Sequence, residues 1–111
     1  MTNVELLNKA FEAENTRDWG ALGGYLHPEV MWFVHGESAH SAIAGREDFI
    51  DQIITDYKVS TITFTCEGMD VSRSGNRVAA VLKYSNNTRC MKVIDFEDSN
   101  IRWVHEFLMD E

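Results

Sequence analysis

The last twelve residues of the chain, NIRWVHEFLMDE, combine an apolar strand pattern with groups that can transfer a proton. Ile101, Trp103 and Phe107 are typical of a packed strand, whereas His105 and Glu106 are ionisable. A charged group at a core position costs free energy unless it is paired or needed. A carboxylate held in such a place is suited to general acid–base catalysis, so this segment is the first candidate for a functional site.

Two other groups of residues invite a chemical interpretation. His35 and His40 flank Glu37, but a metal site needs three or more convergent ligands, and we expect no metal here. We interpret His35 instead as a substrate contact. Cys66 and Cys90 form no CxxC pair and are expected to be reduced, buried thiols. GxGxxG, P-loop and GxSxG motifs are absent, so the sequence predicts no cofactor.

Helical patterns occupy the first half of the chain. Thr2 and Glu5 form a capping box, and Val4, Leu7 and Phe11 then recur at helical spacing. The expected elements are a helix from Thr2 to about Thr16, a short helix after Asp18 that stops at His27, a strand from Val30 to Val34, a polar loop from His35 to Ala44, and a third helix after Gly45.

From Val59 the apolar period changes to two, which is typical of strands. Ser74-Gly75-Asn76, Asn86-Asn87 and Asp98-Ser99-Asn100 are turn signals, and they separate strands at 77–85 and 89–97 from their neighbours. Helices followed by an antiparallel meander give an α+β class. Both faces of the strand from Arg77 are apolar, as are those of the strand from Arg89. We therefore expect a homodimer through the outer face of the sheet, with Trp103, His105 and Phe107 at or near it.

The size and charge limit the possible partners. At 111 residues the chain is expected to form one domain, residues 1–111, and its net charge is −8. Clustered basic residues are missing, which argues against nucleic acid or an anionic membrane as partner. Neither a signal peptide nor a transmembrane span is apparent, and we expect a cytoplasmic protein.

Two stretches resemble a known superfamily. RDWGALGGYLHPEVMWFVHG followed by AGRED is similar to the opening half of the SnoaL-like, nuclear transport factor 2-like superfamily, and VIDFEDSNIRWVHEF resembles its closing hairpin. The resemblance implies a cone-like barrel, in which a strongly curved, mainly antiparallel sheet packs on three N-terminal helices. One end of the cone opens to a pocket. Members include ketosteroid isomerases, limonene-epoxide hydrolases, polyketide cyclases, scytalone dehydratase and noncatalytic domains.

The resemblance also assigns residues to the pocket. The epoxide hydrolases carry a pocket aspartate on the last strand in a W-R-D-Y-F-D run, and Glu106 takes its place here. Alternation then directs Arg102, Val104 and Leu108 inward as well. On the first strand, Trp32 takes the place of a pocket tyrosine. The expected substrate-binding residues are Trp32, Val34, His35, Arg102 and Val104.

The last hairpin supplies a partner for Glu106. If Glu97 pairs with Ile101 across the turn, Lys92 lies opposite Glu106, and opposite charges across an antiparallel pair attract. Glu106, Lys92 and Tyr84 are the candidate catalytic set, with the first two shuttling a proton and Tyr84 donating a hydrogen bond to a substrate oxygen. The alternative is a structural ion pair beside a packing tyrosine.

Departures from the best-known members argue against their chemistry. The base, tyrosine and aspartic acid of the ketosteroid isomerases correspond to Val34, Ala10 or Phe11, and Lys92. Leu82 and Tyr84 replace the Arg-x-Asp pair of the epoxide hydrolases. Two hypotheses remain open. The first is a cofactor-independent isomerase, cyclase, dehydratase or hydrolase acting on a small apolar molecule. The second is a noncatalytic ligand-binding or accessory domain.

Overall fold

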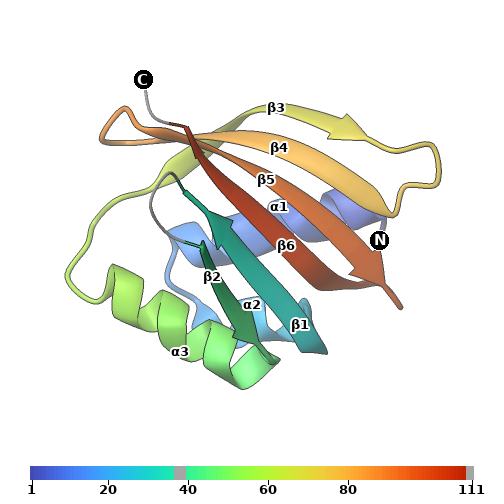
Figure 1. The fold of residues 1–111 in the computed structure, drawn as a ribbon, viewed down its shortest axis with the longest axis horizontal. Coiled ribbons are helices and arrows are strands. Elements are labelled where there is room, and N and C mark those ends of the chain that lie inside the picture. Colours follow the sequence, from blue (N-terminus) through green and yellow to red (C-terminus); the bar gives the residue numbers. More distant parts are fainter. Residues whose placement is uncertain (37–39, 110–111) are drawn as a thin grey trace.

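A computed structural model describes residues 1–36 and 40–109 of the chain. Three helices and six strands alternate unevenly along these residues (Figure 1). In chain order they are α1 (Asn3–Asn15), α2 (Trp19–Gly24), β1 (Leu26–His35), β2 (His40–Ala44), α3 (Arg46–Tyr57), β3 (Phe64–Val71), β4 (Arg77–Tyr84), β5 (Arg89–Glu97) and β6 (Asn100–Met109).

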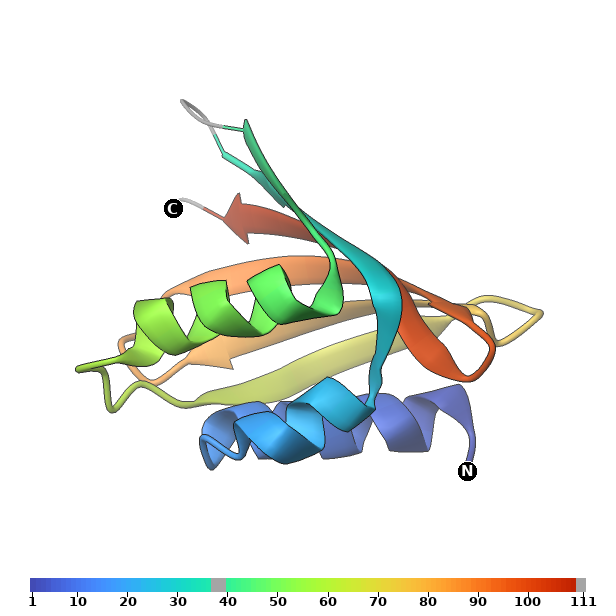
Figure 2. The ribbon, with the colours of Figure 1, turned by 90° about the horizontal axis from the view of Figure 1, so that it is seen from below.

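The strands form one mixed sheet in the order β2-β1-β6-β5-β4-β3. Strand β1 runs parallel to β6, and every other neighbouring pair is antiparallel. The sheet curls around its helical side without closing (Figure 2). The predicted α+β class and the curved, mainly antiparallel sheet on three helices are therefore confirmed, while the cone is an open sheet and not a closed barrel.

The predicted helices are present, and side-chain contacts fix the end of the first one. The capping box of Thr2 and Glu5 starts α1. At its other end the amide of Asn15 donates to the carbonyl of Phe64 and accepts the backbone N–H of the same residue, at 2.9 and 3.0 Å. Arg17 donates to the carbonyls of Ser60 and Ile62. These bonds hold the end of α1 against the start of β3.

Several predicted boundaries are corrected. The segment expected to be a polar loop contains β2, whose His40 pairs with His35 of β1. Strand β1 is longer than expected, and β3 starts only at Phe64. Cys90 is buried as predicted, but Cys66 is exposed on the edge strand β3, whose register against β4 shifts just after it.

An extra residue in β6 sets the register of the last hairpin. Glu97 pairs with Asn100, one position earlier than predicted. Phe96 then pairs with Ile101 while Asp95 pairs with Trp103, so one residue of β6 is left over as a bulge. The bulge cancels the initial offset, and Lys92 lies opposite Glu106 as predicted.

The two faces of the sheet have different surroundings. The inner face packs on the helices, and its core includes Val30, Val78, Ala80, Leu82 and Ile94, all at most 2% exposed. The opposite face has no described helix over it (Figure 2). Among the described residues, no helix is long and apolar enough to cross a membrane.

Candidate functional site

Lys92 lies between two carboxylates in the interior. Its Nζ is 3.5 Å from Oε1 of Glu106 on the neighbouring strand β6 and 3.9 Å from Oε1 of Glu14 on α1. The three side chains are 9, 13 and 8% exposed, respectively. Two acidic groups therefore share one ammonium, and the pair predicted from the hairpin is part of a buried triad.

Glu14 is the member that the sequence interpretation missed. It lies one helical turn beyond Ala10 and Phe11, on the apolar face of α1, so its position in the helical pattern was a usable signal. The bonds from Asn15 to Phe64 hold this end of the helix over the sheet. Oε2 of Glu14 also accepts a 2.7 Å hydrogen bond from the hydroxyl of Tyr57 on α3.

Burial and charge determine the protonation of the groups around the triad. Burial alone would lower the pKa of Lys92, but Glu14 and Glu106 outweigh it and raise the pKa well above its usual value. Burial raises the pKa of the Tyr57 and Tyr84 hydroxyls. It also raises the pKa of the Cys90 thiol. At neutral pH the site therefore offers a cationic lysine, two neutral phenols and a neutral thiol.

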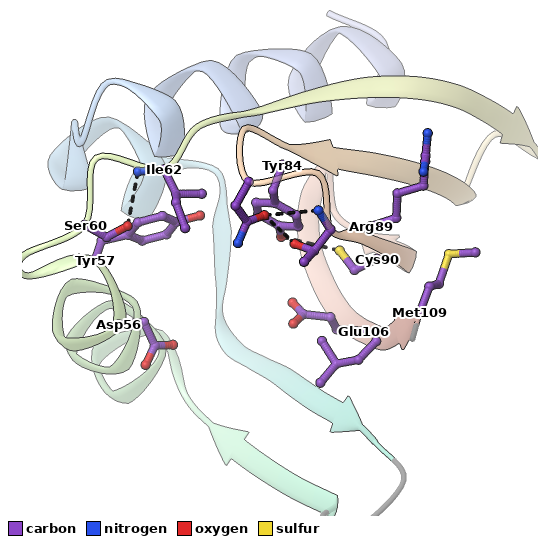
Figure 3. A pocket seen from close by; sticks show the side chains of 12 residues that line it. Asp56, Tyr57, Ser60, Ile62, Tyr84, Arg89, Cys90, Glu106 and Met109 are labelled. Atoms are coloured by element: carbon purple, nitrogen blue, oxygen red, sulfur yellow. Dashed lines mark hydrogen bonds between the residues drawn. The ribbon is translucent and has the colours of Figure 1, made fainter. Parts of the chain in front are cut away.

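A pocket of about 370 Å³ opens beside the triad. Glu106 and Tyr84 line it, and Tyr57 and Asp56 form its opposite side (Figure 3). The remaining lining residues are Ser60, Ile62, Asn86, Thr88, Arg89, Cys90, Leu108 and Met109. The hydroxyl of Tyr84 is 3.4 Å from Sγ of Cys90. Lys92 does not line this pocket, so Glu106 is the triad member that a molecule in it would meet.

The predicted substrate-binding residues on the inner face lie deeper than expected. Trp32 is buried in the core with its ring 4.8 Å from that of Phe49, and it does not line the pocket. Val34 pairs with Glu106 but is also absent from the pocket wall. Val104 lines a separate internal cavity of about 30 Å³, which Glu14 and Lys92 also line.

Arg102 does not reach the pocket, and the bulge in β6 is the reason. The extra residue breaks the alternation that would have placed Arg102 on the same face as Val104 and Glu106. Its guanidinium lies instead over the ring of Trp103, donates to the carbonyl of Glu29 and pairs with Glu97 at 3.0 Å. The predicted inward position of Arg102 is therefore corrected.

His35 lies on the outer face of the sheet. Successive strand residues point to opposite faces, so Val34 and His35 cannot both face inward. Nε2 of His35 is 3.1 Å from Nδ1 of His105, and its ring stacks on Phe107 at 4.7 Å. The pocket contact predicted for His35 is thus not present. Glu37 and the side chain of His40 lie outside the described part of the chain.

One cluster in residues 1–36 and 40–109 has the composition of a metal site. Ligand atoms of His27, Glu97 and Asp98 all lie within 4.8 Å of one another. Nδ1 of His27 accepts the backbone N–H of Glu29 at 3.0 Å, so the neutral ring carries its hydrogen on Nε2 and has no lone pair left for a metal. Glu97 is moreover bound to Arg102. We therefore assign no metal to this cluster.

The raised pKa values predict a loss of stability in alkali. The folded protein holds the protons of Lys92, Tyr57 and Tyr84 more tightly than the unfolded chain does. Above about pH 10 the unfolded chain releases them first, so stability present below that pH is lost as pH rises, by up to about 1.4 kcal/mol per pH unit for each fully shifted group. Urea unfolding between pH 8.5 and 11 measures the slope.

Tyr84→Phe should reduce the amount of free energy of unfolding that is lost per pH unit in alkali. Tyr25→Phe, which removes a hydroxyl elsewhere, is the control. Equal slopes for the wild type and Tyr84→Phe would show that the Tyr84 hydroxyl is not held protonated by the fold.

Solved structures share this architecture over nearly the whole chain. Bal32a, from a soil-derived mobile gene cassette, matches with a TM-score of 0.86 at 18% identity, over 97% of this chain and 89% of that one. An NTF2-like protein of unknown function from Cytophaga hutchinsonii matches with a TM-score of 0.80 at 16% identity, over 98% and 91%. The chain has the nuclear transport factor 2-like fold.

Enzymes also occur among the proteins that share the nuclear transport factor 2-like fold. SalBIII, described as an epoxide hydrolase/cyclase-like enzyme in pyran ring formation in the polyether salinomycin, matches with a TM-score of 0.78 at 15% identity, over 96% of this chain and 90% of that one. No protein-family model and no curated protein sequence matches this chain. Identities this low establish the fold alone, and function must be argued from the pocket.

Proposed function

We propose that this protein is a cofactor-independent enzyme that binds a small, mostly apolar molecule and moves a proton with Glu106. The observation that carries the proposal is the position of Glu106, whose carboxylate faces an open pocket while a buried ammonium lies 3.5 Å behind it. Placing an acid or base within reach of a bound molecule is the first requirement for general acid–base catalysis.

Each residue of the site has a distinct part in this proposal. Glu106 accepts a proton from a carbon or an oxygen of the bound molecule. Lys92 holds the carboxylate of Glu106 through an ion pair at 3.5 Å, and Glu14 with Tyr57 holds Lys92 in place from the other side. Tyr84, kept protonated by burial, donates a hydrogen bond to the oxygen on which negative charge develops.

The alternative, a noncatalytic binding domain, would fit a pocket filled by its own side chains. The sequence predicted that Trp32 and Leu108 face the pocket, and side chains of this size could fill it. Trp32 is buried in the core, and Leu108 stands at the pocket wall with 52% of its surface exposed. The open pocket therefore favours the enzyme.

A coloured probe tests the proposal before any substrate is known. In 5-nitrobenzisoxazole a base removes the proton on the carbon next to nitrogen, the N–O bond breaks, and its electron pair stays on oxygen as 2-cyano-4-nitrophenolate. The protein should release this product with saturation kinetics, at least about a hundredfold faster than acetate at the same carboxylate concentration. Release no faster than that by acetate would refute the proposed proton transfer.

We further propose that two copies of the chain associate through the outer face of the sheet. The face carries half-buried apolar side chains from neighbouring strands, namely Met31, Phe33, Val81, Met91, Val93, Trp103 and Phe107. Arg77 pairs with Asp95 beside it at 2.6 Å, and Arg89 pairs with Glu67 at 2.7 Å. These two ion pairs neutralise four of the charges beside the apolar side chains, although the whole chain carries a charge of −8.

Sedimentation velocity at micromolar concentration should give a mass of about twice the 12.7 kDa of the chain. Val93→Asp places a charge in the outer face and should yield monomers. Val59→Asp is the control, because Val59 is 96% exposed in a loop. A wild-type monomer under these conditions would remove the proposed interface.

A further inference from the structure

The pocket presents more negative than positive charge to a bound molecule. The carboxylates of Asp56 and Glu106 both line it. Among the described residues that line the pocket, the basic one is Arg89. That guanidinium is held by Glu67, with Nε 2.7 Å from Oε1, and it points away from the pocket centre (Figure 3). Arg89 therefore does little to offset the two carboxylates.

The charges behind the wall do not reverse this balance. Lys92 is shared between Glu14 and Glu106, which leaves one negative charge over within the triad. Arg17 lies 4.0 Å from the centre of the Tyr57 ring, and its guanidinium donates to backbone carbonyls. It does not line the pocket. A cation inside the pocket is thus attracted, and an anion is repelled.

The carboxylate of Glu106 also has unused capacity to accept hydrogen bonds. Its closest charged neighbour is Lys92, whose Nζ lies 3.5 Å from Oε1 in an ion pair. Among the described residues, no donor makes a hydrogen bond to the Glu106 carboxylate. The side chain is only 13% exposed, so solvent reaches it mainly through the pocket. An N–H group carrying positive charge makes the strongest hydrogen bond to such an acceptor.

One part of the pocket wall suits a hydrocarbon. Leu108 and Met109 at its wall are 52 and 40% exposed, which is unfavourable for large apolar side chains unless something covers them. Ile62 and the ring of Tyr84 extend the apolar surface inward. The polar end of a bound molecule would then lie at Glu106 and its apolar body against these side chains.

We propose that the pocket takes small organic cations, with an apolar body and a protonated amine whose N–H donates to Glu106. This inference rests on the proposed function because it uses the same pocket. It adds that the ligand is positively charged. Proton transfer to Glu106 does not by itself require a charged ligand. The overall charge of −8 acts in the same direction by drawing cations toward the protein.

Three probes of one shape and different charge test the inference. The binding of 4-phenylbutylamine, 4-phenylbutan-1-ol and 4-phenylbutyrate is measured by NMR titration at pH 7 and low ionic strength, following the amides of Tyr84, Cys90 and Glu106. The amine should bind at least about tenfold more tightly than the alcohol, and the carboxylate at least about tenfold more weakly. Added salt should reduce both differences.

Glu106→Gln should reduce the preference for the amine over the alcohol to about threefold or less, while the alcohol still binds. Glu29→Gln, which removes an exposed carboxylate at the other end of β1, should keep the full preference. If the alcohol binds and the amine binds no more tightly than the alcohol, the cation inference is wrong, but the pocket is still a binding site. If none of the three probes binds, the proposed function fails together with the inference.

Discussion

Replacing Lys92 with methionine is expected to lower the free energy of unfolding at pH 7 by about 3–5 kcal/mol. Methionine fills a similar volume but leaves Glu14 and Glu106 without their shared cation. Both carboxylates are at least 87% buried in side-chain surface, so their charge cannot be solvated in place of the lost ammonium. Urea unfolding, followed by tryptophan fluorescence, measures the change.

The pH dependence of this variant provides a second readout. Protonation of a stranded carboxylate removes an uncompensated buried charge, so Lys92→Met should regain stability as the pH falls from 7 to 5. Adding Glu14→Gln and Glu106→Gln to Lys92→Met should restore much of the loss at pH 7, because all three charges are then absent. Lys58→Met, at an exposed position, is the control. A loss below about 1 kcal/mol would contradict a buried triad.

The central pair was predicted from sequence, but its register came out right because two departures from the prediction cancel. The turn residues after Glu97 and the alternation of apolar residues gave the hairpin in which Lys92 lies opposite Glu106. The starting register was nevertheless wrong by one residue, and the bulge in β6 compensated for it. A bulge depends on how the curved sheet accommodates its neighbours, which a single strand's pattern does not reveal, so the position of Arg102 was wrong for the same reason.

Glu14 was missed for a different reason. Acidic residues in helices are normally exposed, as Glu12 is on the same helix, so residue type alone predicts that Glu14 lies at the surface. The spacing from Leu7, Ala10 and Phe11 places it on the buried face, but its partner lies 78 positions away on β5. Only the fold brings α1 across the sheet. The face of His35, in contrast, could have been inferred from alternation once Val34 was placed inward.

Glu106→Gln is expected to lower the rate of phenolate release from 5-nitrobenzisoxazole by about 10²–10⁴-fold. Glutamine keeps the shape of the side chain but cannot take up the proton at neutral pH. Lys92 retains Glu14 as its counter-ion at 3.9 Å, so the variant should remain folded. The fold is checked by circular dichroism and by the urea midpoint, and the rate is measured by stopped-flow absorbance with probe in excess.

Glu14→Gln separates direct proton transfer from a general effect of charge. Both glutamates pair with Lys92, but Glu106 lines the pocket and Glu14 does not. If Glu106 itself takes the proton, Glu14→Gln should lower the rate by no more than about tenfold, far less than Glu106→Gln does. It should also leave a titratable base visible in the pH–rate profile, which Glu106→Gln should abolish. If Glu14→Gln and Glu106→Gln lower the rate equally, and the pH–rate profile of both variants still shows a titratable base, then Glu106 acts through Lys92 and is not the base.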